Sequence, residues 1–113
     1  MRILLASLEG YLASDLSVVL GGHAFTIERA DSADDAVDLA RRYHFDVILF
    51  GTGAGGGPGT DIIRRLRAVG SQLPAIGLGR VLDGRSRSRL LDAGADDVLD
   101  MPCDTAELCA RLR

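Results

Sequence analysis

The chain offers few side chains that could act as nucleophiles, bases or metal ligands. It has two cysteines, Cys103 and Cys109, two histidines, His23 and His44, and no lysine. Neither histidine has a cysteine or clustered carboxylates at ligand spacing, so both are expected to be surface or capping residues. Two cysteines are too few for a disulfide scaffold and favour a reduced protein, with Cys103 in a loop and Cys109 a small buried hydrophobe.

A glycine-rich loop is the one segment whose backbone could bind phosphate. Residues 51–56 read Gly-Thr-Gly-Ala-Gly-Gly, which fits G-x-G-x-x-G, a pattern that presents backbone N–H groups before a helix. The loop follows the third apolar run rather than the first, has no acidic residue about twenty positions on, and cannot be a Walker A loop without lysine. We therefore expect no nucleotide binding here, but a flexible surface loop.

Five short apolar runs alternate with amphipathic segments along the chain. We expect strands at residues 3–6, 24–28, 47–50, 74–79 and 97–99, and helices at 11–21, 31–42, 60–69, 85–92 and from 104 onward. In the helix at 60–69, the apolar residues up to Val69 are expected to turn inward, and the arginines, Arg67 among them, to face water. The alternation predicts a flavodoxin-like (βα)5 α/β fold, with a doubly wound five-stranded parallel sheet and helices on both faces.

Length and charge limit the possible functions. With 113 residues, 47% hydrophobic and 4% aromatic, the chain is expected to form one domain, residues 1–113, with an aliphatic core. Its 13 arginines against 16 acidic residues give a net charge of −3, which disfavours nucleic-acid binding by this domain. The apolar run at 3–6 is too short for an export or membrane segment, so we expect a cytoplasmic protein without membrane contact. The last helix stays amphipathic to Arg113, a pattern compatible with a natural protein that continues.

Six motifs follow one another at regular spacing: residues 1–5 and 45–49 in two strands, Gly59 opening a helix, residues 91–97 leading into the last strand, Pro102, and residues 107–113. Together they resemble the receiver domain of two-component response regulators over the whole chain. The likeness is closest to the OmpR/PhoB, winged-helix subfamily.

The resemblance implies a phosphorylation site, but its residue types are missing. Receivers hold magnesium with an acidic pair after the first strand, accept phosphate on an aspartate after the third, and grip it with a hydroxyl after the fourth and a lysine after the fifth. The corresponding positions here are Ser7 and Leu8, Gly51, Gly79 and Met101, and Glu9 alone cannot restore the metal site. Without paired carboxylates or a nucleophile, the resemblance implies a non-enzymatic pseudo-receiver with no metal and no cofactor. Met101 is expected to cover the empty site as apolar filler.

The resemblance also implies a two-fold homodimer through the fourth helix, fifth strand and fifth helix, with salt bridges between subunits. The charged residues of that face are Arg87, Asp96, Asp97, Glu107, Arg111 and Arg113. Acid and base segregated on neighbouring elements make a self-complementary patch. The implied pairs are Arg87 with Glu107 and Asp97 with Arg111, while Arg113 is a substitute partner for Asp96.

Exposed ion pairs contribute only about 0–1 kcal/mol each. Apolar residues between the charges must therefore provide much of the affinity, and Leu90, Leu91 and Ala110 are the expected ones.

Three functions fit these observations. The leading one is a phosphorylation-independent regulatory and homodimerisation domain of a bacterial transcription regulator, whose DNA would be read by a winged helix beyond Arg113. The first alternative is a freestanding adaptor that binds a partner protein. The second is a small-molecule sensor whose emptied pocket is lined by Ser7, Glu9, Gly51, Gly79 and Met101. A natural reading frame that continues past Arg113 would favour the first function over both alternatives.

Overall fold

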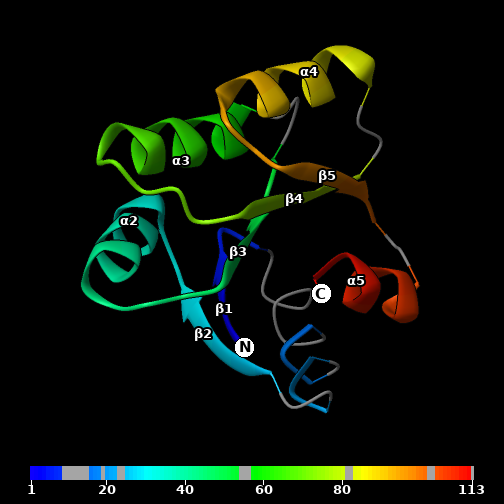
Figure 1. The fold of residues 1–113 in the computed structure, drawn as a ribbon. Helices are drawn as coiled ribbons and strands as arrows, with labels where there is room; N and C mark the ends of the chain where they lie inside the picture. Colours follow the sequence, from blue (N-terminus) through cyan, green and yellow to red (C-terminus); the bar gives the residue numbers. More distant parts are fainter. Residues whose placement is uncertain are drawn as a thin grey trace.

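The computed structural model is an open α/β sandwich in which helices cover both faces of one sheet (Figure 1). It describes residues 1–8, 16–18, 20–22, 25–53, 57–80, 83–101 and 104–112. The strands are β1 (Arg2–Ala6), β2 (Thr26–Ala30), β3 (Val47–Gly51), β4 (Ala75–Gly79) and β5 (Asp97–Asp100). The helices are α2 (Ala33–Arg42), α3 (Gly57–Ala68), α4 (Gly84–Ala93) and α5 (Thr105–Leu112), and residues 16–18, 20 and 21 are also helical.

The five strands form one parallel sheet in the order β2-β1-β3-β4-β5. All five residues of β3 are buried, and so are four of the five in β1, because helices cover both sides of these central strands. This confirms the flavodoxin-like α/β fold expected from the continuous apolar runs. Within the described ranges, no helix is both long and apolar enough to cross a membrane.

Two hydrophobic cores lie on opposite faces of the sheet because successive strand residues point to opposite sides. Leu4, Ile48 and Phe50 pack with α2, α3 and α4 on one face. Their neighbours Ile3 and Leu49 pack with the helical residues near 16–21 and with α5 on the other. A fully buried aliphatic side chain stabilises a fold by about 1.5–3 kcal/mol, so these aliphatic layers supply most of the driving force.

Helix ends follow the capping residues in the sequence. The hydroxyl of Ser32 accepts a hydrogen bond from the Asp35 N–H at 3.1 Å, which confirms the predicted start of α2. Asp83 caps α4 in the same way through the Ser86 N–H at 2.8 Å. Gly94 ends α4 with φ of 120°, a left-handed conformation that favours glycine.

Helix α3 differs from its prediction at both ends. It begins at Gly57, three residues before the expected Thr60, directly after the glycine-rich loop at 51–56. It ends at Ala68, which leaves Val69 outside the helix and 44% exposed rather than turned inward. Pro58 suits the new start, because proline lacks the N–H that the first turn of a helix leaves unbonded.

Arg67 was expected to face water, and this was wrong. Its side chain is only 25% exposed, and its guanidinium donates hydrogen bonds to the carbonyl oxygens of Gly94 at 2.7 Å, Leu73 at 2.8 Å and Ser71 at 3.1 Å. It also forms an ion pair with Asp96 at 3.4 Å. One side chain therefore joins the end of α3 to the start of β4 and to the turn between α4 and β5.

Candidate functional site

The predicted phosphorylation-site positions lie together at the carboxyl edge of the sheet. Gly51 ends β3 and Gly79 ends β4, while Ser7 and Leu8 follow β1 directly. The N–H of Met101, just after β5, donates to the carbonyl oxygen of Gly79 at 2.8 Å. Glu9 lies outside the described residues. Ligands of open α/β sheets bind at this edge, so these positions lie where this architecture places a binding site.

Backbone atoms fill the place where a side chain at position 51 would begin. A Cβ added to Gly51 would lie 2.3 Å from the carbonyl oxygen of Ser7 and 3.1 Å from its carbonyl carbon. Ser7 has φ of 54°, an uncommon conformation for a residue other than glycine. The turn after β1 thus directs a main-chain carbonyl at Gly51. No side chain fits at this position unless the backbone moves.

Among the described residues, those placed at or next to Gly51 are serine, threonine, glycine, leucine and phenylalanine, none of which is an acid or a base at neutral pH. Leu8 and Met101 are half-buried and pack against the core beneath α5. That Met101 covers the site as apolar filler stays a prediction. Thr52 is buried, and its hydroxyl contacts the Gly53 carbonyl oxygen at 3.4 Å. Across the residues that the structure describes, no group of three His, Cys, Asp or Glu side chains is placed to hold a metal ion.

A phenylalanine fills the space behind this edge. Phe50 is fully buried beside Gly59 of α3 and Gly77 of β4. A Cβ added to Gly59 would lie 2.9 Å from the Phe50 ring, and one added to Gly77 would lie 3.0 Å from it. Both positions must lack a side chain for the ring to fit, so the two glycines allow α3 and β4 to pack close to the end of β3.

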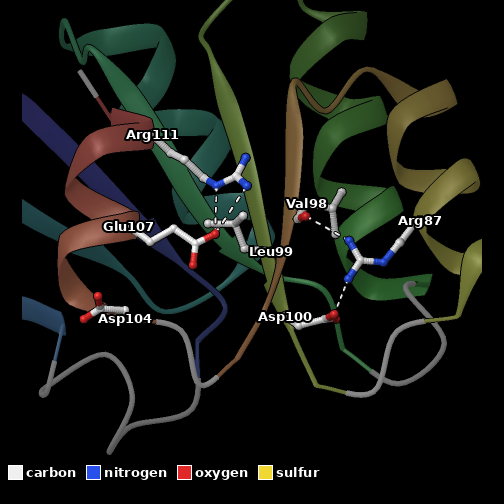
Figure 2. Close-up of a pocket in the computed structure, with 7 residues that line it drawn as sticks. All are labelled: Arg87, Val98, Leu99, Asp100, Asp104, Glu107 and Arg111. Carbon is white, nitrogen blue, oxygen red and sulfur yellow. Dashed lines mark hydrogen bonds and ion pairs between the residues drawn. The ribbon is translucent and has the colours of Figure 1, made fainter.

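The second candidate site is the face formed by α4, β5 and α5, which we call the α4–β5–α5 face. It contains a groove of about 390 Å³ lined by Arg87, Val98, Leu99, Asp100, Asp104, Glu107 and Arg111. Figure 2 shows Arg87 on α4 at one wall, Glu107 and Arg111 on α5 at the other, and β5 running between them.

Ion pairs within the chain connect the charges of this face. Arg111 pairs with Asp97 at 2.7 Å and with Glu107 at 3.3 Å. The hydrogen bond and charge of Asp97, followed by those of Glu107, raise the pKa of Arg111. Arg87 pairs with Asp100 and donates to the carbonyl oxygen of Val98 at 3.0 Å (Figure 2). Each of these arginines therefore already has a carboxylate partner in its own chain.

The other predicted interface residues have different positions. The carboxylate of Asp96 accepts from the Ala75 N–H at 2.8 Å and faces Arg67, so it braces the start of β4. Arg113 lies outside the described residues. The prediction that Leu90 lies at the interface was wrong, because its side chain on α4 is fully buried in the core. Leu91 is 47% exposed, and Ala110 is also exposed.

Sequence reasoning missed Asp100 and Asp104. Asp100 ends β5 and pairs with Arg87, and Asp104 precedes α5 and lines the same groove. The signal for Asp100 was its place two residues after Val98, because residues two apart in a strand point to the same side of the sheet. For Val98 and Asp100 this is the side that α4, with Arg87, covers. For Asp104 the signal was its position at the start of an amphipathic helix.

Comparison with known proteins agrees with this architecture. The crystal structure of a two-component response regulator from Clostridium difficile superposes with a TM-score of 0.89 at 20% identity, covering 99% of this chain and 92% of that one. The receiver domain of sensor histidine kinase PA1611 from Pseudomonas aeruginosa PAO1, whose structure holds a magnesium ion in its active site cleft, superposes with a TM-score of 0.85 at 26% identity. It covers 98% of this chain and 93% of that one.

A curated relative is the cell cycle response regulator CtrA of Brucella ovis, 28% identical over 112 residues. The match covers 99% of this chain and 48% of that protein, so the chain spans about half the length of the curated relatives it matches. The response regulator receiver domain profile matches residues 5–113. Since this match takes in nearly the whole chain, the protein belongs to the response regulator receiver domain family.

Proposed function

We propose that this chain is a degenerate receiver of the OmpR/PhoB type that signals without being phosphorylated. The observation that carries the proposal is the 2.3 Å separation between the Ser7 carbonyl oxygen and the place of a Cβ at Gly51. An acyl-phosphate needs a carboxylate nucleophile, and position 51 has neither the side chain nor the space for one. Ser7 and Leu8 replace the acidic pair that would bind magnesium.

This first part of the proposal has a direct test. Incubation of the protein with acetyl phosphate and magnesium, followed by intact-mass measurement, is expected to leave the mass unchanged. A receiver that has its aspartate serves as the positive control under the same conditions. A magnesium-dependent adduct of one phosphate on this chain would refute the proposal, whichever residue carried it.

We further propose that the domain acts as a homodimerisation and regulatory module of a bacterial transcription regulator in the cytoplasm. The curated relatives are response regulators about twice as long as this chain, which supports a role for the receiver beside a second domain. DNA would be read by that second domain, beyond Arg113. The α4–β5–α5 face supports self-association, because it has exposed Leu91 and Ala110 next to charges of both signs.

Homodimerisation through this face can be tested by mixing two charge-reversed variants. Asp97→Arg leaves two arginines at positions 97 and 111, and Arg111→Asp leaves two aspartates there. If position 97 of one subunit meets position 111 of the other, each variant alone repels its own copy. A mixed dimer then has opposite charges at both two-fold related contacts. The equimolar mixture is expected to associate severalfold more tightly than either variant by itself.

The mixing design separates contacts between chains from contacts within one chain. Asp97 and Arg111 also pair within the chain, but mixing leaves the intrachain charges unchanged. The matched control is the exposed pair Asp38 and Arg42 on α2, 3.2 Å apart, where mixing Asp38→Arg with Arg42→Asp should give no new association. Sedimentation velocity measures both mixtures. Equal behaviour of the mixture and the separate Asp97 and Arg111 variants would remove this contact from the interface and favour the adaptor alternative.

A further inference from the structure

The arginine on the α4 wall of the groove has a carboxylate beside it that the resemblance does not include. The guanidinium of Arg87 donates one Nη to the Val98 carbonyl oxygen at 3.0 Å and pairs through the other with Asp100. The Arg87 side chain is 33% exposed and that of Asp100 is 56% exposed, so the pair lies at the rim of the groove, where a second molecule could reach it.

The glutamate implied as the partner of Arg87 across a dimer is also engaged within its own chain. Glu107 accepts from Arg111, which in turn pairs with Asp97. A contact between Arg87 and Glu107 of two copies therefore replaces intrachain ion pairs and does not add a new pair to two free charges. Each such contact exchanges two intrachain pairs, Arg87 with Asp100 and Arg111 with Glu107, for one pair between chains, so it contributes little to affinity.

The net charge of the groove also disfavours tight self-association. Of the described residues, Arg87, Arg111, Asp100, Asp104 and Glu107 line the groove, and Asp97 pairs with Arg111 beside it, so this set has two more acidic than basic groups. Two identical faces brought together would then meet with excess negative charge on both sides. The carboxylate of Asp100 therefore opposes self-association in two ways, because it occupies Arg87 and adds to the excess negative charge.

From this arrangement we infer that Asp100 is an intrachain competitor that weakens the homodimer by holding Arg87. This inference rests on the proposed dimerisation through the α4–β5–α5 face. Asp100 thereby keeps the domain in a weakly associating range. The occupant of the groove is a second copy of this chain.

The experiment compares dissociation constants of isosteric variants by sedimentation equilibrium. Asp100→Asn removes the competing charge and is expected to tighten the dimer about fivefold, since the contact occurs twice in a two-fold dimer and each exposed pair is weak. Asp104→Asn removes a charge from the same groove without freeing Arg87, and asparagine caps a helix as well as aspartate does. Asp38→Asn removes the same charge from the exposed pair on α2, away from this face.

Tightening by Asp100→Asn well beyond that by Asp104→Asn, with Asp38→Asn unchanged, supports the competitor role. In an Arg87→Gln background, Asp100→Asn should give no gain beyond that of Asp104→Asn, because no guanidinium is left to release. Equal tightening by the two groove variants would show a general charge effect and overturn the inference while leaving the dimer. If neither the wild type nor any variant associates at about millimolar concentration, both the inference and the proposed dimerisation fail.

Discussion

Replacement of Gly51 by alanine is the smallest change that tests the closed phosphorylation site. The added Cβ would begin 2.3 Å from the Ser7 carbonyl oxygen and 3.1 Å from the carbonyl carbon. Carbon atoms approach carbonyl oxygens to about 3.3–3.6 Å, so the end of β1 must move by about 1 Å. The obstacle is main chain rather than the far end of a flexible side chain, and the movement therefore disturbs the β1–β3 pairing.

The expected loss of stability follows from the size of this movement. Overpacking a well-packed interior costs about 1–3 kcal/mol, and a backbone obstacle favours the upper part of that range. Alanine restricts the unfolded chain more than glycine does, which offsets about 0.4–1 kcal/mol. The net expectation for Gly51→Ala is a loss of about 2 kcal/mol in the free energy of unfolding and a decrease in Tm of ~10 °C.

Urea denaturation monitored by circular dichroism measures this loss. The matched control is Gly84→Ala at the start of α4, where an added Cβ meets no atom within 4 Å, so stability should stay equal or rise slightly. Gly51→Asp should be destabilised at least as much as Gly51→Ala and should still fail to take a phosphoryl group from acetyl phosphate with magnesium. A Gly51→Ala protein with the wild-type denaturation midpoint, or a phosphorylated Gly51→Asp protein, would refute the reasoning.

Two further predictions concern residues that hold α4 and β5 in place, Arg67 and Asp83. Arg67→Gln should lower the free energy of unfolding by about 2 kcal/mol, because carbonyl oxygens such as that of Gly94 lose their donor, whereas exposed Arg64→Gln should change it by less than about 0.5 kcal/mol in the same urea titration. Hydrogen bonds from Ser86, above all from its backbone N–H, lower the pKa of Asp83 below its ordinary value of 3.8. The stabilisation that the ionised Asp83 gives the fold is therefore complete above pH 3.8, and it is lost as the pH falls through the lower pKa of the folded state. Asp83→Asn keeps a capping side chain but should lack this acid-dependent loss of stability. Thermal unfolding of the wild type and of Asp83→Asn, followed in parallel from neutral to acid pH, measures the difference, and an equal loss in both proteins would contradict this role of Asp83.

Most of the fold could be predicted from the sequence because buried parallel strands leave continuous apolar runs. The run at 47–50 gave β3 nearly in full, and Ser32 marked the start of α2. Strand β2 was placed two residues early, since its burial is partial and it lies at the sheet edge, where periodicity is weak. In α4, the spacing of Ser86, Leu90 and Ala93 already indicated that Leu90 faces inward, and the sequence reasoning overlooked it.

The candidate sites were less accessible to sequence reasoning. The positions at the carboxyl edge follow from the ends of the strands, so Gly51 and Gly79 could be located. The Ser7 carbonyl could not, because it depends on a left-handed serine, and that conformation has no signature in residue type. Arg67 lay beyond prediction for a similar reason: its three acceptors are backbone carbonyls of two separate connections, α3–β4 and α4–β5, which only the folded chain brings together.

The hydrogen bond from Arg87 to Val98 has a consequence for how the sheet can grow. Strand β5 is the last strand, so it leaves backbone groups on its outer side that another strand could pair with. The guanidinium of Arg87 occupies the Val98 carbonyl oxygen, and the strand is only four residues long. Addition of a sixth strand to the sheet is therefore disfavoured at this edge. Loss of the guanidinium would leave the Val98 carbonyl oxygen without this donor, and the edge would then resist strand addition through its short length alone.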